Sequence, residues 1–213
     1  MTLKFPRYST IPFPSYQFIP GQNPHPTEDL RGHSFGKKLE DFSQYRKVSP
    51  LVFSENKTGG TTKIADELSA KAIFLPLDVT KWSGKPQYLY AIDLYNHGFW
   101  WEAHEVLEQF WGAVPRGDVQ SHFFQGLIKM SAAFIKWVLK EQRGVIFHYT
   151  SGKDLLSVVM RTQVVYCGIN LKEYLEKVEG HFRNVVQEPV KWTDPMENYP
   201  FIELKGYNKF SEN

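Results

Sequence analysis

The segment from Asp118 to about residue 142 constrains the fold more than any other part of the chain, because its apolar residues recur at helical spacing. At about 100° per residue, one broad face collects the large apolar side chains of Phe123, Leu127, Met130, Phe134, Trp137 and Val138. The opposite face carries Lys129, Lys136 and Lys140. An apolar face this wide must pack against two or more neighbouring helices, so the sequence predicts an α-helical bundle.

Further helices are predicted on both sides of this segment from helix-breaking and capping residues. Their expected ranges are about 86–97, 100–112, 145–165 and 170–189. Pro86 suits a first helical turn, and Asp118 and Asn170 are suitable N-caps, the latter with Glu173 three residues later. Short connections favour antiparallel neighbours. We therefore expect an all-α fold, an antiparallel bundle of about five helices over residues 81–189.

The two ends of the chain are expected to pack on this bundle and to complete one structural domain. Residues 1–80 hold most of the prolines and many glycines, which predicts a long, mostly irregular N-terminal arm. Because aromatic residues are spread through it, unlike a disordered tail, we expect the arm to dock on the bundle. The C-terminal tail, residues 190–213, carries Trp192, Tyr199 and Phe201 as candidate anchors.

Composition narrows the classes of function. The formal net charge is only +2, with 25 basic and 23 acidic side chains interspersed, so a nucleic-acid partner is not expected. Neither a signal peptide nor a run of about 20 apolar residues is evident, so we expect no membrane association and, by default, a cytoplasmic location. Cys167 is the single cysteine, which excludes an intramolecular disulfide and favours a small packed residue. A homo-oligomer remains open.

The segment Phe99–Gly112 carries the most chemistry, with the sequence FWWEAHEVLEQFWG. Side chains at i and i+4 share a helix face, so His104 and Glu108 are expected to converge beside the apolar face. Glu105 can join Glu108, whereas Glu102 is expected to face away from His104. An imidazole with one or two carboxylates is half of a divalent-metal site, and helical bundles build such sites in this way.

Other polar residues are candidates to complete the site. His25 and His33 lie in turn-like segments of the arm, PGQNPHP and RGHS, and are candidate metal ligands. Gln125 is a polar group close to the apolar face of the 118–142 helix. Zinc, manganese or iron would suit such ligands. Glu105 and Glu102 are then the candidate catalytic carboxylates.

Each of these residues also has a purely structural interpretation. His104 could be a histidine at the edge of the core that is held by Glu108, and Glu102 and Glu105 could be solvated or capping charges. His25 and His33 could serve only to fix the arm. The other histidines are expected to be structural or exposed: His97, His122, His148 and His181.

Familiar catalytic motifs gain no support from the sequence. In HExxH a second histidine follows the first at i+4, but here Glu108 occupies that position. No GxxxxGK[ST] or GxGxxG motif occurs, so P-loop and dinucleotide-binding functions lose support. The run GHSFG at 32–36 matches the letters of GxSxG, but it lies in the predicted irregular arm and not at the strand-to-helix turn that this motif requires, so a serine hydrolase gains no support.

Two blocks of sequence nevertheless resemble a known family. The run 94–111, LYNHGFWWEAHEVLEQFW, and the run 124–128, FQGLI, resemble the signature of the bacterial, archaeal and plastid family known as domain of unknown function 309. The resemblance implies a compact helical bundle and a metal-dependent hydrolase of unassigned substrate. By position, the family's polar and aromatic signature residues correspond to Asn96, Glu102, His104, Glu105, Glu108, Trp111 and Gln125.

Three functions are compatible with these features. The first is a metal-dependent hydrolase acting on a small molecule, with a metal held by His104 and Glu108 and Glu105 as general base. The second is a helical interaction module, since residues 88–110 also resemble one hairpin of a tetratricopeptide repeat, although no second copy follows at a period of about 34 residues. In the third, the His/Glu cluster is a structural polar network.

Overall fold

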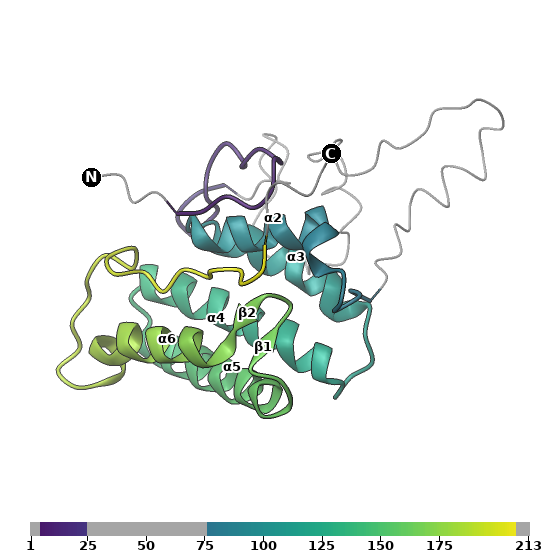
Figure 1. Ribbon diagram of the computed structural model, residues 1–213. Helices are drawn as coiled ribbons and strands as arrows, with labels where there is room; N and C mark the ends of the chain where they lie inside the picture. Colours follow the sequence, from purple (N-terminus) through teal and green to yellow (C-terminus); the bar gives the residue numbers. More distant parts are fainter. Residues whose placement is uncertain (1–4, 25–75, 208–213) are drawn as a thin grey trace. The chain divides into compact units, whose positions relative to one another are not determined.

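The computed structural model describes residues 5–24 and 76–207 (Figure 1). Residues 5–17 and 76–207 belong to one unit, and residues 18–24 belong to another. In the first unit the described residues form a short 3-10 helix, Trp82–Gly84, and five α-helices: α2 (Pro86–Asn96), α3 (Trp100–Gly112), α4 (Val119–Val138), α5 (Gln142–Thr162) and α6 (Leu171–Val186). The prediction of an all-α bundle is confirmed.

Each α-helix packs against the next one in the chain, and α4 lies at the centre of the bundle. Its predicted apolar face is buried, with Phe123, Leu127, Met130 and Phe134 wholly inaccessible to solvent. Among the described residues no helix is both long enough and apolar enough to cross a membrane.

Local sequence signals set where the helices begin. Pro86 occupies the first turn of α2, and the Asp118 carboxylate caps α4 by accepting a hydrogen bond from the backbone of Gln120. The Asn170 side chain caps α6 through the backbone N–H of Glu173 and also donates to its carboxylate. The caps predicted from the sequence are therefore the ones that the structure uses.

The structure corrects the predicted boundaries at both ends of α5. The preceding helix, α4, ends at Val138 rather than near residue 142, and α5 begins at Gln142 rather than near residue 145. Helix α5 stops at Thr162 rather than near residue 165, and a hairpin of two short strands follows, β1 (Val165–Tyr166) and β2 (Ile169–Asn170). Its two turn residues, Cys167 and Gly168, both have positive φ, as a tight two-residue hairpin requires. Burial raises the pKa of the Cys167 thiol to about 12, which agrees with the expected packed, unreactive residue.

Two glycines let α4 and α5 approach closely. A Cβ atom added to Gly126 would lie 2.6 Å from Leu156, and one added to Gly152 would lie 3.1 Å from the Gly126 carbonyl oxygen. Gly126 is the glycine of the FQGLI block, so this part of the signature fixes the register of α5 on α4.

The N-terminal arm contacts α2 through one buried carboxylate. Asp93 accepts hydrogen bonds from the backbone N–H groups of Tyr8 and Ser9 at 2.7 and 2.8 Å. The Arg7 guanidinium donates to the same carboxylate at 3.2 Å. These three hydrogen bonds to Asp93 all come from residues 7–9.

The C-terminal tail contacts α2 and α3 through its aromatic residues and its backbone. Tyr199 donates to the Tyr95 carbonyl at 2.7 Å and accepts from the Trp100 indole at 2.9 Å. In the separate unit, residues 18–24 contain a turn in which the Asn23 side chain accepts from the backbone N–H of Ile19.

Candidate functional site

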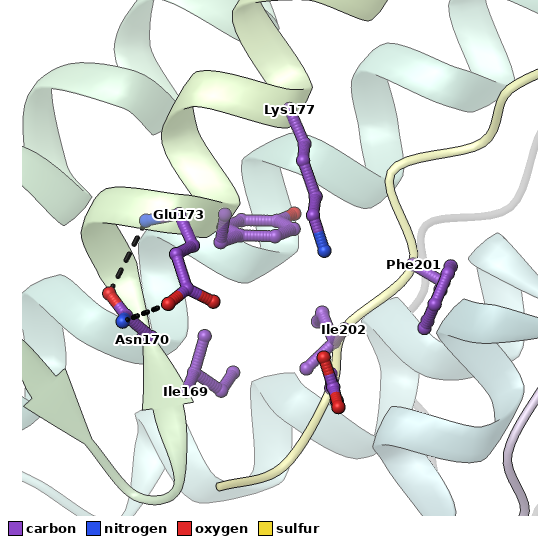
Figure 2. A pocket seen from close by; sticks show the side chains of 8 residues that line it. Ile169, Asn170, Glu173, Lys177, Phe201 and Ile202 are labelled. Atoms are coloured by element: carbon purple, nitrogen blue, oxygen red, sulfur yellow. Dashed lines mark hydrogen bonds between the residues drawn. The ribbon is translucent and has the colours of Figure 1, made fainter.

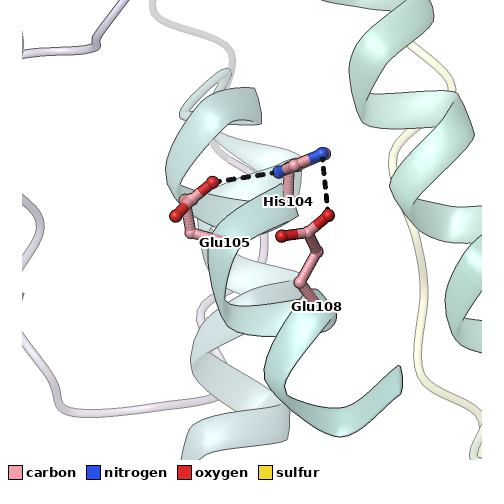
Figure 3. Close-up of side chains that lie close together, drawn as sticks. All are labelled: His104, Glu105 and Glu108. Atoms are coloured by element: carbon pink, nitrogen blue, oxygen red, sulfur yellow. Dashed lines mark hydrogen bonds and ion pairs between the residues drawn. The ribbon is translucent and has the colours of Figure 1, made fainter. Parts of the chain in front are cut away.

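Three side chains of α3 form a cluster at the edge of the bundle. His104 Nδ1 lies 3.2 Å from Glu105 Oε1, and His104 Nε2 lies 3.6 Å from Glu108 Oε1. Figure 3 shows the two carboxylates at opposite edges of the imidazole ring. The convergence of His104 and Glu108 follows from their i, i+4 spacing, as the sequence indicated. Among the described residues this is the one group of three or more side chains whose ligand atoms are close enough to hold a metal ion.

The cluster spans the boundary between core and solvent. The Glu105 residue is only 5% exposed, whereas the side chains of His104 and Glu108 are 21% and 33% exposed. Glu102 is also buried, so neither Glu102 nor Glu105 is a solvated charge. Glu102 lies in the first turn of α3, so its alternative interpretation as a capping charge is not contradicted. The second carboxylate oxygen of Glu105, Oε2, is buried and has no hydrogen-bond partner among the described residues. A buried carboxylate oxygen without a partner is costly, which marks this group as incomplete.

The contact with Glu105 determines how the imidazole is used. A carboxylate beside Nδ1 favours the tautomer in which Nδ1 carries the proton and donates it to Glu105. The lone pair of Nε2 then points towards Glu108 and is available to a cation. Trp101 stacks on the same ring, with centroids 5.7 Å apart, and restricts its rotation.

Glu102 lies apart from this cluster. Its charge acts on Tyr16 of the arm and on Tyr90 of α2, where, second to burial, it helps to raise the pKa of Tyr90 to about 12. The expectation that Glu102 faces away from His104 agrees with this environment, and a catalytic role for Glu102 next to His104 gains no support from it.

The remaining signature residues have structural partners. The Asn96 side chain donates to the Ile202 carbonyl at 2.9 Å and accepts from the Ile202 N–H at 2.7 Å, so it anchors the tail. The Trp111 indole donates to Ser121 at 3.0 Å and packs under the Arg116 guanidinium. Gln125 is half-buried on α4. His25 and His33 lie outside the described residues.

His148 of α5 is a residue whose position the sequence did not reveal. It was expected to be structural or exposed. Burial, together with the charges of Lys129, Lys136 and His104, lowers its pKa to about 4, so it is neutral at pH 7. Its Nδ1 atom is buried without a hydrogen-bond partner among the described residues. The position of His148 relative to α4 could have been predicted only from the contact between Gly126 and Gly152, because that contact sets the register of α5 on α4.

A shallow hollow lies elsewhere, where β2, α6 and the tail meet (Figure 2). Its cavity volume is only about 10 Å³, roughly the space of one water molecule, and it is lined by Ile169, Asn170, Glu173, Tyr174, Lys177, Phe201, Ile202 and Glu203. Ligand pockets usually have volumes of about 300–1,000 Å³. The hollow is smaller than that and contains none of the α3 cluster, so it does not compete as the functional site.

The comparisons with known proteins identify one family. Residues 88–147, from α2 to the first turns of α5, match the model of the family described as domain of unknown function (DUF309). The resemblance drawn from the two sequence blocks is therefore confirmed over this range. No curated protein matches the chain. No solved structure matches it either.

Proposed function

We propose that His104 and Glu108 bind a divalent metal ion and that the protein is a metal-dependent hydrolase. The observation that carries the proposal is the arrangement around the imidazole. Buried Glu105 holds Nδ1, which leaves Nε2 facing a carboxylate oxygen at 3.6 Å. Metal-binding histidines characteristically donate their other ring N–H to a carboxylate or carbonyl in this way.

The distances and the donor atoms fit such an ion. Two ligands of one tetrahedral zinc, each bound at about 2.0–2.1 Å, lie about 3.4 Å apart. The 3.6 Å between Nε2 and the Glu108 oxygen is close to that value. Nitrogen and carboxylate donors suit zinc, manganese or iron.

The residues of the chain have distinct roles in this proposal. A bound divalent ion supplies a water molecule whose pKa is lowered towards neutrality. His104 and Glu108 position that ion, and Glu105 fixes the tautomer of His104. Since Glu105 lies at the Nδ1 edge, a positioning role suits it better than the role of general base. His25 and His33 remain candidates for further ligands.

The proposal includes a small-molecule substrate and a cytoplasmic location. It includes no nucleic-acid partner, which the nearly balanced charge of the chain supports. It makes no choice between a monomer and a homo-oligomer.

A non-enzymatic helical module, with the cluster as a structural polar network, is the second candidate. The hydrogen bond between His104 and Glu105 favours it, because the two groups partly satisfy each other. The unpartnered Glu105 oxygen weighs against it, since a structural network normally satisfies all its buried members.

Metal content separates the two candidates. Elemental mass spectrometry on protein without a histidine tag, incubated with zinc, manganese or iron(II), should show near-stoichiometric metal in the wild type. His104→Ala and Glu108→Gln should lose it, because each removes a ligand. Glu102→Gln is the matched control, a buried glutamate of the same helix outside the cluster, and should retain the metal.

Either of two results would overturn the metal site. One is a wild type that retains none of the three ions. The other is a folded His104→Ala variant, verified by circular dichroism, that retains as much metal as Glu102→Gln. A positive result would justify a screen of hydrolase substrates.

A further inference from the structure

Two further polar side chains, Lys129 of α4 and His148 of α5, lie near the His104/Glu108 pair. The position of Lys129 follows from how α3 packs on α4. The Trp111 indole bonds Ser121 at 3.0 Å near one end of the contact, and Trp100 stacks on Phe134 at 5.2 Å near the other. Between these two points the helices run antiparallel, so His104 lies level with the part of α4 that carries Lys129.

The register of α5 on α4 brings His148 to within about one helical turn of Lys129. A Cβ atom added to Gly152 would lie 3.1 Å from Cβ of Lys129, and the Lys136 side chain lies against Gly144. His148 is halfway between those two glycines. The Lys129 amino group also lies 5.2 Å from the ring centroid of Phe147, the residue before His148. His104 and Lys129 therefore lie at one level of α3 and α4, and His148 of α5 lies about one helical turn along the bundle from them.

Neither Lys129 nor His148 has an anionic hydrogen-bond partner among the described residues. No carboxylate of the described residues lies within 4.0 Å of the half-buried Lys129 amino group, whereas Lys136 is paired with Glu141 at 2.7 Å. His148 Nδ1 is buried without a partner. A lysine ammonium and a neutral imidazole can both donate hydrogen bonds to an oxyanion.

We propose that Lys129 and His148 form a subsite for the phosphate group of a phosphate monoester, next to the His104/Glu108 pair. The assignment of this group to a substrate rests on the proposed hydrolase function. A second metal ion is disfavoured there because Lys129 and Lys136 are positive. A phosphate dianion instead complements the lysine on one side and a divalent ion on the other. Phe147, the residue before His148, is 60% exposed, so this part of α5 lies at the surface of the protein.

Phosphate binding can be measured on the metal-free protein, independently of the metal assay. Inorganic phosphate is titrated while the imidazole signals of His148 are followed by NMR, and His148→Gln identifies those signals by their loss. The wild type should show a saturable shift. Lys129→Gln should bind at least about tenfold more weakly, because it loses a charge-assisted hydrogen bond. Lys172→Gln, at an exposed position of α6, should bind phosphate with the same affinity as the wild type.

The same titration with glycerol phosphate tests whether the subsite accepts an ester. Binding at least as tight as that of inorganic phosphate supports a monoester substrate, and binding of inorganic phosphate alone overturns that assignment. The absence of a saturable shift in the wild type, or equal affinities for wild type and Lys129→Gln, overturns the subsite. If the metal assay fails while this titration succeeds, the hydrolase proposal falls and the anion subsite stands.

Discussion

Two buried carboxylates on neighbouring helices, Asp93 of α2 and Glu105 of α3, are held in different ways. On α2, Asp93 accepts three hydrogen bonds from the arm, and Asn96 exchanges two with the backbone of Ile202. On α3, Glu105 has one contact to His104 and one buried oxygen without a partner among the described residues. The α2 group joins distant parts of the chain, whereas the α3 group is incomplete.

This difference separates architecture from a candidate site. Buried polar groups are expected to be satisfied, and each exception needs an explanation. Satisfied groups such as Asp93 explain how the arm and tail are held. Glu105 is one of several exceptions, and it differs in holding an imidazole whose other nitrogen faces the Glu108 carboxylate, an arrangement that a cation between Nε2 and Glu108 would complete.

The comparison is tested most severely by making the same chemical change on both helices, from carboxylate to amide. Asp93→Asn should lower the free energy of unfolding by about 3–4 kcal/mol, because an NH2 group would then face N–H donors at a buried position. Denaturant unfolding followed by circular dichroism measures this loss. A loss below about 1 kcal/mol would show that the arm contributes little.

Asn96→Ala should have the next largest effect. It leaves the N–H and C=O groups of Ile202 without partners in a buried position, at a cost of about 2–3 kcal/mol. Unfolding experiments measure this cost, and limited proteolysis should show earlier cleavage of the tail. Asn170→Ala is a control, because it removes an exposed cap and should cost only about 1 kcal/mol.

How far these roles could be predicted depends on how local their causes are. Asp118 and Asn170 act on residues two or three positions away, so the helix starts were predictable. The convergence of His104 and Glu108 lies within one turn and was predictable for the same reason. The role of Asn96 was not, since its partner is 106 residues away in the sequence.

The burial of Glu102 and Glu105 escaped prediction for a related reason. A helical wheel of α3 shows which side chains share a face, but not which other segments cover that face. Glu102 is close to residues of the arm and of α2, and the level of His148 depends on a glycine contact between α4 and α5. These contacts are properties of the tertiary fold.

His181 is a buried histidine that should make the stability of the protein depend on pH. Its Nε2 has no partner among the described residues, yet the ring packs against Phe134 and Trp137 and is neutral at pH 7. Burial lowers its pKa from 6.5 to about 4. Between these pH values the unfolded chain takes up a proton that the folded protein does not, so stability falls on acidification.

The expected loss from His181 between pH 6.5 and 4 is about 1–2 kcal/mol, after allowance for its partial exposure. Unfolding free energies measured at several pH values should show a shallower slope for His181→Gln. His148→Gln should flatten the profile as well, because the pKa of His148 is lowered to a similar value. Identical profiles for wild type and His181→Gln would contradict the assignment.

Glu105→Gln should have the smallest effect on stability, below about 1 kcal/mol in the metal-free protein. The amide still accepts from His104 Nδ1, and the change removes a buried charge that lacks a full set of partners. Metal affinity, measured by competition with a chelating dye, should nevertheless fall by about 10–100-fold, because the imidazole loses its anionic partner. Asp93→Asn should show the reverse, a large loss of stability with unchanged metal affinity. If Glu105→Gln instead costs as much stability as Asp93→Asn, both helices carry architecture and the α3 cluster is a structural network.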